Sequence, residues 1–165
     1  RDILILRDPF NLLASRLKWV RHGGKYTLTD QEFRDTIVLR KQYAQEFLGE
    51  TAFLRDVIPI SYNQWFASGA YRQELADEIG VTFTDAGVND VPGYGPTDAD
   101  ASFDGVRYDG QARDMNVLSR WEAFRDDETY RRMIADEEMI SLAADIFGRD
   151  TKQAVEGLGL SVGGN

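Results

Sequence analysis

Residues 3–17 read ILILRDPFNLLASRL, and the rest of the predicted fold is built around them. Four consecutive apolar residues, Ile3 to Leu6, predict a strand that is covered on both faces. Pro9 is tolerated in the first turn of a helix, where its missing N–H would be unpaired in any case, and Asp8 precedes it in a capping position. The residues that follow are apolar at helical spacing, so we expect a strand, a tight turn and a helix in succession.

Arg7 and Ser15 are the candidate functional residues of this stretch. Arg7 ends the predicted strand, and open α/β sheets bind their ligands at the carboxyl ends of strands. Its guanidinium suits forked recognition of phosphate, and Ser15 offers a hydroxyl two turns into the helix. The spacing alone favours a simpler alternative, in which Arg7 pairs with Asp8 and Ser15 bonds back to its own helix. Both interpretations stay open at this point.

The order of Arg7, Pro9 and Ser15 resembles the 3′-phosphate-binding motif of the sulfotransferase family. That motif has an Arg at the strand end, a Pro two residues later and a Ser eight residues after the Arg. The family uses 3′-phosphoadenosine 5′-phosphosulfate as its sulfuryl donor. The resemblance implies an α/β class with a partial P-loop-like sulfotransferase fold, in which a few parallel strands accompany predominantly helical content. It also implies that Arg7 and Ser15 bind the 3′-phosphate of the donor.

A second strand and helix extend the resemblance. We expect a strand, a turn and a helix over residues 57–62, 63–68 and 70–79. Pro59 cannot donate to a ladder and therefore predicts an edge or an irregularity. Tyr62 stands where the family has a Tyr near the adenine, although Asn63 and Gln64 replace the usual acidic pair. Read from its residues alone, Tyr62 is a half-buried aromatic side chain of the strand.

The region from Val81 to Arg113 is long, irregular and rich in turn signals. A loop of this length in a compact domain is usually functional or disordered. By resemblance, Ser102 and Arg107 occupy the place of the family's loop that closes over the nucleotide phosphates, so they are candidate donor contacts. The alternative is a surface loop.

The other helices are predicted from caps and periodicity. Thr29 and Glu32 form a capping box for a helix that reaches Leu48, with Arg40 and Glu46 on its solvated side. Helical periodicity resumes at residue 115 with Trp121 in the core, and residues 129–134 and 136–147 are expected to form one broken helix or two short ones. The chain is expected to form one sulfotransferase-like domain over residues 1–150, followed by a loosely held, glycine-rich tail over residues 151–165.

Composition excludes several classes of function. The chain has 165 residues, a net charge of −9 and 42% hydrophobic residues, which is ordinary for a soluble globular domain and unlike a nucleic-acid binder. It has no cysteine and one histidine, so thiolate and paired-histidine metal sites are excluded within one chain. His22 could act as a general base or lie in a solvated loop. No segment reaches the ~20 apolar residues of a membrane span. We expect a soluble protein without a metal, with a cytoplasmic location preferred.

Catalytic residues are not identified by this sequence. The family's phosphosulfate loop and catalytic base lie upstream of its Arg motif, and no Gly-x-x-x-x-Gly-Lys-Ser/Thr segment occurs here. The chain is therefore expected to be a C-terminal portion that acts on a small-molecule or glycan acceptor once an upstream segment or second chain completes it. Two alternatives remain: a non-catalytic nucleotide-binding or protein-interaction module, and a piece of a larger assembly.

Overall fold

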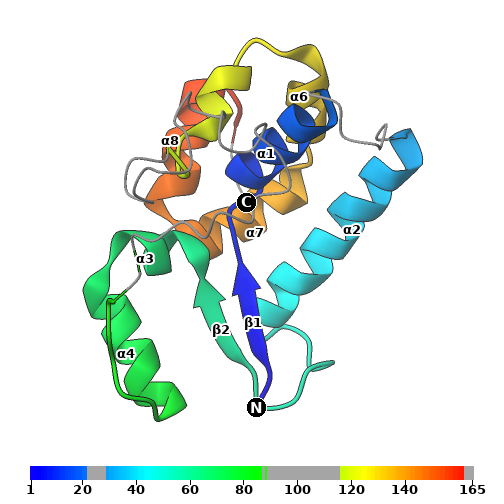
Figure 1. The fold of residues 1–165 in the computed structure, drawn as a ribbon. Helices are drawn as coiled ribbons and strands as arrows, with labels where there is room; N and C mark the ends of the chain where they lie inside the picture. The colour runs from blue at the N-terminus through cyan, green and yellow to red at the C-terminus, as the bar shows by residue number, and fades with distance from the viewer. Residues whose placement is uncertain (22–28, 87, 89–115, 162–165) are drawn as a thin grey trace.

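The protein is mostly helical around a small parallel sheet (Figure 1). The computed structural model describes residues 1–21, 29–86, 88 and 116–161. The strands are β1 (Ile3–Leu6) and β2 (Ile58–Ser61), and the helices are α1 (Pro9–Arg21), α2 (Asp30–Phe47), α3 (Tyr62–Ala67), α4 (Gly69–Ile79), η2 (Arg120–Phe124), α6 (Glu128–Met133), α7 (Glu137–Phe147) and α8 (Arg149–Leu158). This composition confirms the coarse α/β class.

The helices divide between the sides and the carboxyl end of the sheet. Figure 1 shows α2 and α4 on opposite sides of the two strands. The helices α1, α6, α7 and α8 gather beyond the carboxyl ends of the strands. Both strands therefore point their last residues toward the helical part of the molecule, which is where the candidate site lies.

The prediction that the first strand is covered on both faces is wrong. Leu4 and Leu6 are buried in the main core, but Ile3 and Ile5 are 52% and 59% exposed. Strands β1 and β2 pair in parallel with Ile5 beside Ile60, so these residues share one face of the sheet. On that face, helix α4 packs against the residues of β2 and leaves Ile3 and Ile5 of β1 uncovered.

Proline at the centre of β2 fits the expectation of an edge. Pro59 is exposed and is paired with Leu4, and β1 is the only neighbour of β2 in the described part of the chain. An edge strand tolerates proline because a missing N–H need not break a ladder on its open side. The strand ends at Ser61, one residue before the predicted limit.

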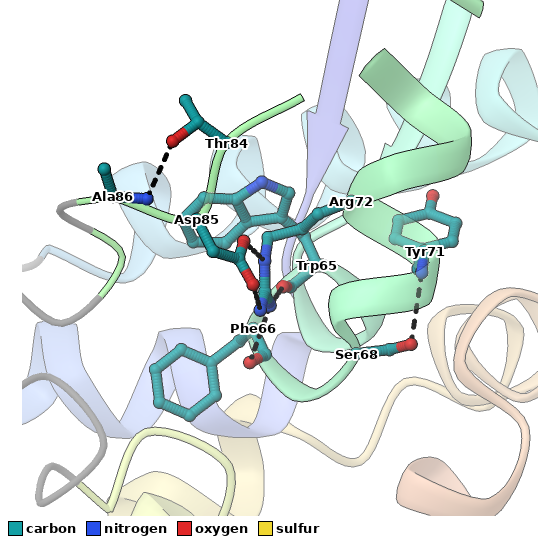
Figure 2. Close-up of polar contacts among 8 residues, drawn as sticks. All are labelled: Trp65, Phe66, Ser68, Tyr71, Arg72, Thr84, Asp85 and Ala86. Atoms are coloured by element: carbon teal, nitrogen blue, oxygen red, sulfur yellow. Dashed lines mark hydrogen bonds and ion pairs between the residues drawn. The ribbon is translucent and has the colours of Figure 1, made fainter. Parts of the chain in front are cut away.

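The turn predicted over residues 63–68 is a helix instead. Ser61 caps α3 by accepting a hydrogen bond from the Gln64 amide at 3.4 Å. Ser68 ends α3 and also caps α4, accepting from the Tyr71 amide at 3.1 Å (Figure 2). Two serine caps in close succession thus turn polar residues into a short helix.

Local capping signals elsewhere are confirmed. The Asp8 side chain accepts a hydrogen bond from the Asn11 amide at 2.8 Å at the start of α1. Thr29 and Glu32 form the expected capping box at the start of α2. Because these bonds join residues three positions apart, the sequence alone predicts them well.

The region before α6 is less regular than predicted. Residues 120–124 form a short 3₁₀ helix, η2, rather than a longer α-helix. Trp121 is 3% exposed and lies in the core, as expected. The two later helices, α6 and α7, begin at the caps Asp127 and Asp136.

Helix α8 occupies part of the segment expected to be a loose tail. Its buried residues are Thr151, Ala154, Val155 and Leu158, a spacing of one helical face. Gly157 packs against the Trp121 ring, where a Cβ would lie 2.7 Å from Cζ3. Residues 151–158 are therefore part of the packed domain, and residues 162–165 lie outside the described range.

Candidate functional site

The carboxyl ends of the two strands bring Arg7 and Tyr62 together. Arg7 follows β1 directly, and Tyr62 is the first residue after β2. The Arg7 guanidinium lies over the Tyr62 ring, 5.2 Å from its centroid, which is a cation–π contact. Its Nη2 donates a hydrogen bond to the Val117 carbonyl at 2.5 Å. Parallel pairing thus places these two predicted site residues side by side.

Ser15 joins the same cluster through a residue that the sequence did not single out. Its hydroxyl donates to the Asn11 carbonyl at 3.0 Å, as the simpler alternative expected. It also accepts a hydrogen bond from Arg120 Nη1 at 2.7 Å, across 105 positions of sequence. Arg120 is 8% exposed and begins η2, so the irregular packing of η2 against α1 sets this contact.

The cluster concentrates positive charge in a buried place. The pKa of Arg7 is lowered mainly by burial and also by the nearby Arg120 charge, while Asp8 and the phenol group of Tyr62 act in the opposite direction. Two guanidinium groups therefore repel each other where water screens them poorly. Among the described residues, the Arg7 Nε–H has no hydrogen-bond partner. An anion between these groups would relieve the repulsion and accept that hydrogen bond.

The Asp8 carboxylate accepts hydrogen bonds from a residue of its own helix and not from Arg7. Its carboxylate accepts from the Asn11 amide at 2.8 Å and from Asn11 Nδ2 at 3.0 and 3.1 Å. Burial raises the pKa of Asp8, and the bonds from Asn11 oppose that effect. The predicted hydrogen-bonded pair of Arg7 and Asp8 does not form within the described residues, because Asp8 caps α1 and Arg7 turns toward Val117.

Arg40 adds a third guanidinium to this end of the sheet. The prediction that it lies on the solvated side of α2 is wrong, because its side chain packs against the end of β1 and donates to the Arg7 carbonyl. Burial, with a further contribution from Arg16, lowers the pKa of Arg40 to about 10. Glu46 was also expected in solvent and is 2% exposed. Helical spacing places both side chains on the polar side of α2, but the tertiary fold half-buries Arg40 and buries Glu46.

Aromatic residues flank the Arg7 side of the cluster. Tyr62 stacks near Trp65 and Phe66, with ring centroids 6.1 and 6.2 Å apart. Trp65 is 37% exposed, so a flat aromatic surface borders the cationic cluster. This surface can take a planar ring of a ligand whose anionic group reaches Arg7.

Arg72 holds this aromatic surface in place, as Figure 2 shows. Its Nε and Nη2 bind both carboxylate oxygens of Asp85, at 2.7 and 2.9 Å. Its Nη1 donates to the carbonyls of Trp65 and Phe66 at the end of α3. One forked ion pair thereby ties α3, α4 and the segment after α4 together.

Three predicted residues cannot be placed in this cluster. Ser102, Arg107 and His22 lie outside the described residues. In the described part of the chain, no group of three carboxylate or histidine side chains could hold a metal ion. No helix in that part is long and apolar enough to cross a bilayer.

The comparisons with known proteins identify no relative: no family model, no curated protein and no solved structure matches the chain. The class of site is therefore defined by geometry alone. It is a cationic cluster with one hydroxyl and an aromatic border, which is suited to anchoring an anion with a planar ring.

Proposed function

We propose that this chain is the donor-anchoring portion of a sulfotransferase-like enzyme, with a partial P-loop-like fold. In this proposal Arg7 and Ser15 bind the 3′-phosphate of 3′-phosphoadenosine 5′-phosphosulfate, and Tyr62 borders the adenine. The observation that carries it is the meeting of Arg7, Ser15 and Arg120 at the carboxyl end of a parallel strand. Arg120 is then the phosphate ligand that the sequence motif alone does not reveal.

The charges of the cluster support a phosphate rather than a neutral group. Arg7 and Arg120 both carry charge in a buried site, and a phosphate dianion would accept charge-assisted hydrogen bonds from each. The Ser15 hydroxyl already accepts a hydrogen bond from Arg120, and it could donate one to a phosphate oxygen by turning from the Asn11 carbonyl. Arginine clusters of this kind are effective because the guanidinium fork matches phosphate geometry.

The reaction itself needs groups that this cluster does not offer. Sulfuryl transfer would break the S–O bond of the phosphosulfate and form a new S–O bond to a hydroxyl or an S–N bond to an amine of a small-molecule or glycan acceptor. The acceptor's proton must pass to a base. We assign that base and the phosphosulfate loop to an upstream segment or second chain, so the residues described here orient the donor and raise the rate by positioning.

Calorimetric titration with adenosine 3′,5′-bisphosphate tests the proposal. We expect the chain to bind it, and Arg7→Ala to weaken binding by about 2 kcal/mol, or roughly thirtyfold, because a charged hydrogen bond is lost. Ser15→Ala should weaken binding less. The matched control is Arg132→Gln, which removes an exposed charge from α6 and should leave affinity unchanged.

A second ligand separates the 3′-phosphate site from general nucleotide binding. Adenosine 5′-monophosphate lacks the 3′-phosphate, so we expect its affinity to be lower and insensitive to Arg7→Ala. Equal affinity for both nucleotides would contradict the assigned role of Arg7 and Ser15. Sulfuryl transfer by a completed protein, or its absence, then decides between an enzyme and a non-catalytic nucleotide-binding module.

A further inference from the structure

A pocket with an apolar wall and a cationic rim lies between α2 and α7. The empty space at the pocket, open solvent included, is about 310 Å³, and Leu6, Arg7 and Pro9 line it near the carboxyl end of β1. The apolar wall comprises Ala44 of α2 and Met139, Leu142, Ala143, Ile146 and Phe147 of α7. The rim comprises Arg7, Arg40 and Lys41. Three cationic side chains and a larger set of apolar ones therefore line the same pocket.

The three cations of the rim differ in how their charges are matched. Lys41 is paired with Asp136 and Glu138, at 3.1 and 2.8 Å. Arg7 has the Val117 carbonyl and the Tyr62 ring. Arg40 contacts only a carbonyl, that of Arg7, and forms no ion pair with any described residue. Arg40 is therefore the rim cation with charge left to offer.

The surroundings of Arg40 favour an added anion. The charges of Arg16 and Arg7 repel it, and Asp8 alone among its charged neighbours attracts it. The Asp8 carboxylate is already engaged by Asn11. A half-buried guanidinium with more positive than negative neighbours is stabilised when an anion binds beside it.

We propose that this pocket binds a short-chain organic acid, with its carboxylate on Arg40 and its alkyl chain against the α7 wall. The ligand class follows from charge at the rim and apolar residues along the wall. An inorganic anion would leave the wall uncovered, and a neutral alkane chain would leave Arg40 unmatched. The site shares Arg7 with the proposed nucleotide anchor, but Ser15 and Arg120 do not line it.

A titration of the whole chain with butyrate, followed by amide NMR shifts, tests the proposal. We expect shifts that saturate at millimolar concentrations and cluster on α2 and α7. From propionate to butyrate, affinity should rise about fourfold for a fully buried methylene group. If butanol bound with the same affinity as butyrate, the assignment to Arg40 would be overturned. If inorganic phosphate bound with the same affinity as butyrate, the role of the apolar wall would be overturned.

Arg40→Gln tests the anchor and has a matched control on the same helix. We expect Arg40→Gln to weaken butyrate binding at least tenfold, because the charge-assisted hydrogen bonds are lost. Arg34→Gln removes an exposed charge from α2 and should leave binding unchanged. Equal loss in both variants would show that butyrate responds to overall charge, and would overturn the proposal.

A second variant keeps the test valid if Arg40→Gln disturbs the end of β1. Ala44→Leu narrows the pocket from the α2 side, suits a helix and leaves Arg40 in place. We expect it to abolish the preference for butyrate over propionate. It should leave adenosine 3′,5′-bisphosphate binding intact, so failure of this pocket and failure of the nucleotide anchor are distinguishable. An unchanged preference would overturn the proposal.

Discussion

The carboxylate of Glu46 holds the turn that follows α2. Its side chain is 2% exposed, although helical periodicity places it in solvent. Its carboxylate accepts bonds from the Thr51 hydroxyl, the Phe53 amide at 3.1 Å and the Leu54 amide at 2.9 Å. The carboxylate thereby satisfies two backbone amides that follow the turn and fixes the connection from α2 toward β2.

We expect Glu46 to make stability depend on pH. Burial acts to raise the pKa of Glu46, but the bonds from Thr51, Leu54 and Phe53 outweigh burial and lower it. The unfolded chain, with a carboxyl pKa of about 4.3, then takes up the proton first as pH falls. The contribution is complete well above pH 4.3 and is lost as pH falls through the lower, folded-state pKa.

Chemical denaturation at pH 7 and at acid pH measures this contribution. Glu46→Gln removes the titrating group, so the variant should be less stable at pH 7 and should lose less stability on acidification than the wild type. Glu50→Gln is the control, because Glu50 is exposed on the adjoining turn. Parallel stability curves for wild type and Glu46→Gln would contradict this role.

At the scale of elements, the contact between η2 and α8 closes the core. The Trp121 ring fills the space over Gly157, and Leu158, next along α8, is 2% exposed. Arg131 of α6 donates to the Leu158 carbonyl at 2.9 Å, which holds the end of α8. The glycine-rich composition of this segment led to the prediction of a loose tail. Gly157, however, is required because it packs closely against Trp121, and not because the chain must be flexible there.

Gly157→Ala tests that packing. Alanine gains about 1 kcal/mol of helix propensity, but its Cβ would clash with Trp121 and overpacking costs typically about 1–3 kcal/mol. We expect a net loss of stability, with a change in Trp fluorescence. Gln153→Ala, on the exposed side of α8, should change stability by less than about 0.5 kcal/mol. A more stable Gly157→Ala variant would show that α8 does not press on Trp121.

At the scale of the whole molecule, the sheet is covered unequally. The main core covers the face with Leu4 and Leu6, and the smaller cluster of Ile58, Ile60 and Leu75 covers only the β2 half of the other face. Parallel sheets are usually buried on both sides. The uncovered isoleucines of β1 are therefore the place where this architecture departs most from a complete α/β layer.

Neighbouring residues of β1 measure this asymmetry. Leu6→Ala should cost about 2–5 kcal/mol, because it leaves a cavity in the main core. Ile5→Ala should cost less than about 1 kcal/mol, since its side chain is 59% exposed. Denaturant melts at several protein concentrations make the comparison. An equally large, concentration-dependent loss for Ile5→Ala would show that association covers this face.

Local sequence was enough to predict a strand, a capped turn and a helix at the start of the chain, the capped start of α2, and Arg7 at a strand end. These features depend on bonds and preferences that span about four residues. The packed fold was needed to establish which face of β1 is covered, that Arg40 lies against the end of β1, and that Arg120 contacts Ser15. Those outcomes depend on packing between segments far apart in the chain, and no local spacing encodes such packing.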